Sequence, residues 1–81
     1  MSVLIGDAEL RQQLLSGNEE FKRLAAEHQS YDDQLEQLSR RHHLTDAERI
    51  HEITLKKRKL MLKDQMYSMV QKYRKELKSE S

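Results

Sequence analysis

The first half of the chain carries a single stripe of apolar positions within mostly polar sequence. From Leu10 to Leu38 the stripe advances in alternating steps of four and three residues. This alternation has the 3.5-residue period of a coiled coil. It predicts a helix over about residues 8–41 that buries one narrow seam. The seam consists of Leu10, Leu14, Gly17, Phe21, Leu24, His28, Tyr31, Leu35 and Leu38.

Gly17 leaves two interpretations of this first helix open. The segment Ser16-Gly17-Asn18-Glu19 fits a capping box in which Ser16 is the N-cap and Glu19 follows three residues later. That interpretation predicts a kink or a new helix start at about residues 16–18. The seam nevertheless continues through Gly17 without a change of spacing, which favours one continuous helix.

A turn is predicted at about residues 42–45, although this stretch contains neither glycine nor proline. Continuing the seam spacing beyond Leu38 gives polar residues, so one unbroken coiled-coil helix is not expected. Thr45-Asp46-Ala47-Glu48 fits a second capping box and marks a helix start. A second helix is therefore predicted over about residues 46–78.

The predicted second helix is apolar on two sides. At about 100° per residue, one side can pack against the first helix in an antiparallel hairpin, and the other side has no partner in that hairpin. The inner side carries Leu55, Leu62, Met66, Met69, Val70, Tyr73 and Leu77, and the outer side carries Ile50, Ile53, Leu60, Met61 and Tyr67.

The antiparallel hairpin predicts a register in which the numbers of facing residues sum to about 87. This register is poor next to the turn, where Leu35 and Leu38 would face polar residues of the second helix. A shift in register, a plug formed by Leu44, or a contact with another chain would each resolve the mismatch. Away from the turn, the predicted pairs are Leu10 with Leu77, Leu14 with Tyr73, Gly17 with Val70, Phe21 with Met66, and Leu24 with Leu62.

The unpartnered outer side predicts self-association. A chain of 81 residues is small enough that oligomerisation is a common way to complete its core. The simplest arrangement is a dimer that pairs the second helices of two copies as a four-helix bundle. The sequence therefore predicts an all-α protein, in which residues 1–81 form a single coiled-coil-like helical hairpin.

The composition excludes several other classes of protein. Apolar residues make up 36% of the chain and charged residues 36%, and there is no cysteine, proline or tryptophan. A disulfide scaffold and a thiolate metal site are excluded, and no apolar run approaches the ~20 residues of a transmembrane helix. The N-terminus has neither a basic start nor a long apolar region. We therefore expect a cytoplasmic protein with no membrane span.

Charge is distributed unevenly along the chain. Residues 1–48 carry five Lys/Arg against ten Asp/Glu, and residues 49–81 carry ten against four. The favoured interpretation is ion pairing between the two predicted helices, which helps to set their orientation. The alternative is a nucleic-acid-associated protein whose basic side chains bind phosphates. The basic stretch consists of Lys56, Lys57, Arg58, Lys59 and Lys63, which spread around the helix.

Two groups of residues are candidate metal ligands. Glu48 and His51 form an E-x-x-H pair, and the predicted fold brings Glu36 near them, which would suit a metal-binding helical bundle. His28 and Asp32 lie four residues apart, and the favoured interpretation is a histidine at the edge of the core that bonds to Asp32 or lies near Lys59. No glycine-rich phosphate loop or catalytic triad is recognisable. We therefore expect no cofactor and no enzymatic activity.

Two stretches of the chain carry the most specific motifs. The first is Phe21-x-x-Leu24-x-x-x-His28-x-x-Tyr31-Asp32-x-x-Leu35-x-x-Leu38, and the second runs from Leu55 to Met66 as LKKRKLMLKDQM. Together they resemble the YdcH-like family of small bacterial proteins over about residues 10–70. The resemblance implies helical hairpins or coiled coils and a bacterial source, and because the family is a domain of unknown function it implies no activity. The favoured function is that of a structural or interaction protein acting through coiled-coil packing.

Overall fold

Three helices make up the computed structural model, which describes residues 6–79. They are α1 (Asp7–Gly17), α2 (Glu19–Ser39) and α3 (Asp46–Ser79). The predicted all-α class is confirmed, because the described residues form helices and connecting segments without a strand. Residues 1–5 and 80–81, which the predicted domain includes, lie outside the described residues. None of the helices within residues 6–79 has the length and apolar character needed to cross a membrane.

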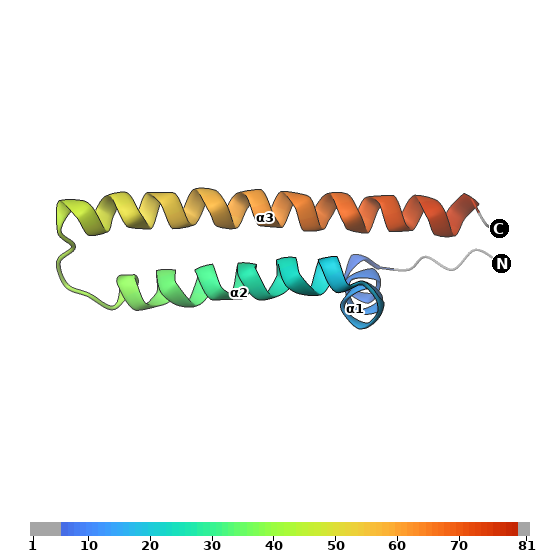
Figure 1. Ribbon diagram of the computed structural model, residues 1–81, viewed down its shortest axis with the longest axis horizontal. Helices are drawn as coiled ribbons and strands as arrows, with labels where there is room; N and C mark the ends of the chain where they lie inside the picture. The colour runs from blue at the N-terminus through green and yellow to red at the C-terminus, as the bar shows by residue number, and fades with distance from the viewer. Residues whose placement is uncertain (1–5, 80–81) are drawn as a thin grey trace.

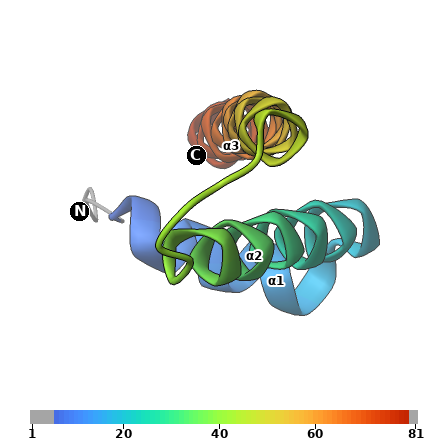
Figure 2. The ribbon, with the colours of Figure 1, turned by 90° about the vertical axis from the view of Figure 1, so that its left-hand side faces the viewer.

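The helices α2 and α3 run antiparallel along an elongated molecule measuring 56 × 20 × 17 Å (Figure 1). The connection between them covers residues 40–45. The helix α1 does not extend α2 in the same direction, and instead crosses the end of α2 (Figures 1 and 2). Both α1 and α2 lie on the same side of α3. The opposite side of α3 is therefore left without a covering helix in the described chain.

The break between α1 and α2 is made at Asn18 and not at Ser16. Asn18 has extended backbone angles (φ −121°, ψ 112°), and the Phe21 N–H donates to its Oδ1 atom at 2.9 Å. The Asn18 N–H donates to the Leu14 carbonyl and so ends α1. The capping box predicted with Ser16 as N-cap is wrong, because its hydroxyl donates to the Gln12 carbonyl within α1. Asparagine is as strong an N-cap as serine, so the residue preference at the N-cap did not distinguish Asn18 from Ser16.

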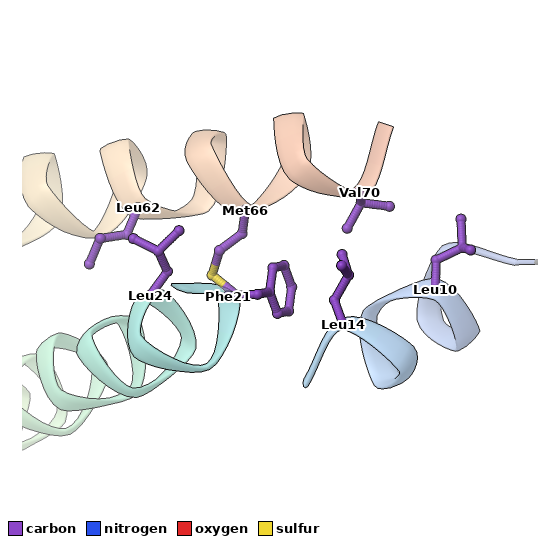
Figure 3. Close-up of a cluster of buried hydrophobic side chains, with 7 residues drawn as sticks. All are labelled: Leu10, Leu14, Phe21, Leu24, Leu62, Met66 and Val70. Carbon is purple, nitrogen blue, oxygen red and sulfur yellow. The ribbon is translucent and has the colours of Figure 1, made fainter. Parts of the chain in front are cut away.

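All three helices contribute to one apolar cluster (Figure 3). Phe21 lies beside Met66, and Leu24 lies beside Leu62. Leu10 and Phe21 are fully buried. Burial of each such side chain stabilises the folded chain by about 1.5–3 kcal/mol. The cluster consists of Leu10 and Leu14 from α1, Phe21 and Leu24 from α2, and Leu62, Met66 and Val70 from α3.

The close contact predicted between Gly17 and Val70 is wrong. A Cβ atom added to Gly17 would meet nothing within 4 Å. Val70 instead points towards Leu14 (Figure 3). The physical reason is the turn at Asn18, which redirects α1 and moves its last residue away from α3. The seam spacing therefore continues through Gly17, although the helix does not.

Next to the turn, the predicted register left Leu38 facing polar residues of the second helix. Further along the hairpin, Lys59 Nζ lies 2.5 Å from Asp32 Oδ1 and links α3 to α2. Leu38 is only 9% exposed and Leu55 is buried. Leu38 therefore finds apolar cover within its own chain, and its burial needs no second chain.

The start of α3 carries the predicted capping box. The Glu48 N–H donates to Thr45 Oγ1 at 3.1 Å, and the Thr45 N–H donates to Glu48 Oε1 at 3.0 Å. These two bonds satisfy backbone donors that a helix start leaves without partners. Arg41 also forms an ion pair with Glu48, which ties the connection to the first turn of α3.

Candidate functional site

The outer face of α3 is the main candidate for a functional surface. We define it by the five large apolar residues that are exposed within residues 6–79, each between 53% and 66% accessible to solvent. All five belong to α3, and they are the residues of the predicted outer side. They are Ile50, Ile53, Leu60, Met61 and Tyr67.

The residues of the outer face lie along one side of α3. From Ile50 to Tyr67 the stripe extends for about 25 Å at the helical rise of 1.5 Å per residue. At about 100° per residue it lies opposite the buried Leu62 and Met66. Exposed apolar residues gathered on one side of a helix mark interaction sites in soluble proteins more often than scattered single residues do.

Two charged residues, Lys57 and Asp64, interrupt the outer face. Both are exposed, and they lie seven residues apart, so they share one side of the helix. Neither makes an ion pair or a side-chain hydrogen bond with another residue in the described range 6–79. The outer face thus contains one cation and one anion, each available to a binding partner. Sequence reasoning assigned Lys57 only to the basic stretch and missed Asp64, although their heptad spacing from Ile50 was a usable signal.

The basic stretch is partly engaged in ion pairs. Lys59 contacts Asp32 across the two helices, as the cross-helix interpretation predicted. Lys56 lies 3.9 Å from Glu52 of the same helix, so cross-helix pairing is wrong for this residue. Both contacts are partly exposed to solvent and contribute little to stability. The predicted cross-helix ion pairing of the basic stretch is therefore found at Lys59.

The Asp32 carboxylate shows the electrostatic effect of this pairing. The hydrogen bond and the positive charge of Lys59 lower the pKa of Asp32, and nearby His28 adds a smaller contribution in the same direction. Partial burial opposes the shift without overcoming it. Asp32 is therefore ionised near neutral pH and acts as a structural partner of Lys59.

The three candidate metal ligands do not form a metal site. Glu36 accepts a hydrogen bond from Arg40 at 2.7 Å, and Glu48 belongs to the capping box. Hydrogen bonds from Thr45 lower the pKa of Glu48. His51 is exposed. No group of three or more histidine, aspartate or glutamate side chains within residues 6–79 is placed to hold a metal ion, so the three candidate ligands do not come together in the single chain.

A shallow hollow of about 290 Å³ lies between the three helices. His28 is half-buried at its edge, together with Arg11 from α1 and Lys63 and Tyr67 from α3. The position of Arg11 follows from the turn at Asn18, which brings α1 across α2. Sequence reasoning missed this group of residues because it left the direction of α1 open.

These features define an all-helical protein with a packed inner seam and an exposed apolar helix face. The chain matches the family described as Protein of unknown function (DUF465) over residues 21–70. The match covers more than half of the chain, and the protein belongs to this family. The matched range includes every outer-face residue and leaves out α1. No curated protein and no solved structure matches the chain.

Proposed function

We propose that the protein is a structural or interaction protein that self-associates through the outer face of α3. The observation that carries the proposal is the exposure of five large apolar side chains on one helix whose other side packs against α1 and α2. Covering each of them in an interface would contribute about 1.5–3 kcal/mol. Two copies joined in this way would place their α2 and α3 helices in a four-helix bundle. The YdcH-like resemblance adds the proposal that this occurs in a bacterial cytoplasm.

A second copy of the chain suits the charges of the outer face. Over residues 46–79, α3 carries ten Lys/Arg against five Asp/Glu, and a strongly acidic partner would be expected to use that excess. The outer face itself contains one Lys57 and one Asp64 and is balanced. A two-fold interface brings the same patch of both copies together. In such an interface, the cation of each patch can pair with the anion of the other copy.

The proposed role requires no catalytic residue. Asp32 and Glu48 both have pKa values below their ordinary range, because Lys59 and Thr45 stabilise their ionised forms. General acid–base catalysis near neutral pH favours a carboxyl group with a raised pKa. Neither carboxyl group therefore suits general acid catalysis near neutral pH.

Sedimentation equilibrium over a wide concentration range tests the proposal. We expect the molar mass of the unmodified protein to rise above the single-chain mass of 9.7 kDa as concentration increases. The double substitution Ile53→Glu with Leu60→Glu should keep the mass at the single-chain value and leave the helical circular dichroism signal intact. These two residues are exposed in the single chain, so the substitutions do not disturb the core.

The matched control places the same two negative charges elsewhere. Gln37 and Gln65 are exposed residues outside the outer face, and Gln37→Glu with Gln65→Glu should associate as the unmodified protein does. A protein that stays at the single-chain mass at every concentration would overturn the proposal. Equal association of the outer-face variant and the control would also overturn it.

A further inference from the structure

The positions of Lys57 and Asp64 define a direction for the interface, provided that self-association uses the outer face as proposed above. The numbers 57 and 64 sum to 121, and so do 60 and 61. The two charges are therefore symmetrically placed about the Leu60–Met61 pair at the middle of the apolar stripe. A two-fold axis passing near this pair would exchange the positions of the two charges between copies.

We infer that two copies pair their α3 helices antiparallel, with facing residues whose numbers sum to about 121. Lys57 of each copy then lies opposite Asp64 of the other copy, and the interface contains this ion pair twice. Leu60 of one copy packs near Met61 of the second. The long lysine side chain tolerates a small shift in register, because it can span about one helical turn.

The apolar residues fit the same arrangement. In this register Ile53 faces residue 68 of the second copy and lies next to its Tyr67. Each aromatic ring is thereby placed beside a β-branched side chain. The overlap extends over residues 46–75, which is most of α3. The helices α1 and α2 of both copies remain on the outside, because they cover the other side of α3 (Figure 1).

A parallel pairing in the same register places like charges together. Lys57 would face Lys57, and Asp64 would face Asp64, both within an otherwise apolar seam. Charged residues at seam positions of coiled coils select orientation and register in this way. Charges buried without an opposite partner are strongly unfavourable. The charge pattern of the outer face therefore favours the antiparallel pair.

One feature of α3 opposes any pairing of two copies. Lys56 and Lys63 border the outer face, and the antiparallel register brings Lys56 towards Lys63 of the second copy. Both residues are exposed and lie at the edge of the interface, where salt screens their repulsion over about 8 Å at physiological ionic strength. Lys56 also lies close to Glu52, which reduces the repulsion further.

Distances between spin labels test the orientation directly. The chain contains no natural cysteine, so Arg58→Cys and Lys72→Cys each provide a single labelling site and each remove one exposed cation. In the antiparallel pair the two labels at residue 58 lie near the axis, at less than about 25 Å. The labels at residue 72 are separated by about 35 Å along the helix, from the rise of 1.5 Å per residue. A parallel pair would give short distances at both sites.

A charge exchange provides the second test. Lys57→Glu places two acidic residues opposite each other in both pairs, and we expect the dissociation constant to rise roughly tenfold or more. The combination of Lys57→Glu with Asp64→Lys recreates both opposite-charge pairs and should restore the dissociation constant to within about threefold. Neither residue has an ion-pair or side-chain hydrogen-bond partner within residues 6–79, so circular dichroism should show unchanged helicity.

The possible outcomes separate the two proposals. A long distance at residue 72 with recovery by the charge exchange supports the antiparallel pair. Short distances at both sites overturn the antiparallel inference. So does a dimer whose dissociation constant is unchanged by both substitutions. Neither result contradicts self-association itself. If no distance between labels on two copies can be measured and the molar mass stays at the single-chain value at every concentration, the proposed function itself is overturned.

Discussion

The two sides of α3 have similar residues and opposite surroundings. Leu62 on the inner side is 8% exposed, and Leu60, two residues earlier, is 59% exposed. The difference does not come from the side chains, which are identical. It comes from α1 and α2, which both lie on one side of α3 (Figures 1 and 2).

This comparison separates residues that hold the fold from residues that are available for binding. On the inner side, Phe21 and Leu10 supply the atoms that exclude water from α3. On the outer side no described part of the chain does so. An apolar residue of α3 therefore contributes to the stability of the single chain only if it faces α1 or α2.

The largest expected effect is on the inner side, where Leu62→Ala removes a packed side chain. We expect it to lower the free energy of unfolding by about 2–5 kcal/mol, from lost burial and the cavity left behind. The matched substitution Leu60→Ala should change it by less than about 0.5 kcal/mol, because Leu60 is exposed. Urea unfolding followed by circular dichroism measures both.

The comparison must be made at one low protein concentration. Self-association stabilises the folded chain by mass action, so Leu60→Ala should become more destabilising as concentration rises. Equal effects of the two substitutions at a concentration where the protein is a single chain would contradict the assignment of the two sides.

An intermediate effect is expected at Asn18, which directs α1 onto the inner side. Asn18→Ala removes the acceptor of the Phe21 N–H and should lower the free energy of unfolding by about 1 kcal/mol. Asn18→Ser retains a capping oxygen and serves as the control. If Ser16→Ala proved more destabilising than Asn18→Ala, the position of the helix break would be different from the one described.

The smallest expected effect is a dependence of stability on acidic pH. The folded pKa values of Asp32 and Glu48 lie below the ordinary values of 3.8 and 4.5. Their contribution to stability is present above the ordinary values and is lost as pH falls through the folded values. Stability should therefore change little between about pH 7 and 5 on account of these groups and decrease below about pH 4.

Asp32→Asn should remove part of this acid dependence and leave the part due to Glu48. Both contacts are exposed, so the change is small. Urea midpoints measured at several pH values for Asp32→Asn and the unmodified protein would show it. If the urea midpoints of the two proteins depended on pH in the same way below pH 4, a role of the Lys59–Asp32 pair would be excluded.

The periodicity of the sequence predicted the helical class and the composition of both sides of α3. Phe21, Leu24, Leu62 and Met66 entered the core as their spacing indicated. Periodicity succeeds here because residues that share one face of a helix are set by local geometry alone. The same helical periodicity predicted the exposure of the outer face, because packing against a single antiparallel partner can cover only one side of α3.

Periodicity failed where two local solutions were equally good. Ser16 and Asn18 are both strong caps, and the seam spacing at Gly17 also permitted a continuous helix. The choice of Asn18 depends on where α1 can place Leu10 and Leu14 against α3 (Figure 3). That contact joins residues far apart in the sequence, and local propensity holds no information about it.

The sequence by itself thus determined that the chain is helical, which residues of each helix share a face, and where α3 begins. The tertiary structure alone decided that α1 crosses α2, that Gly17 faces open space, and that Leu38 is covered by its own chain. The physical reason is that local rules act over one or two helical turns. The direction of α1 is set by burial of side chains brought together from all three helices.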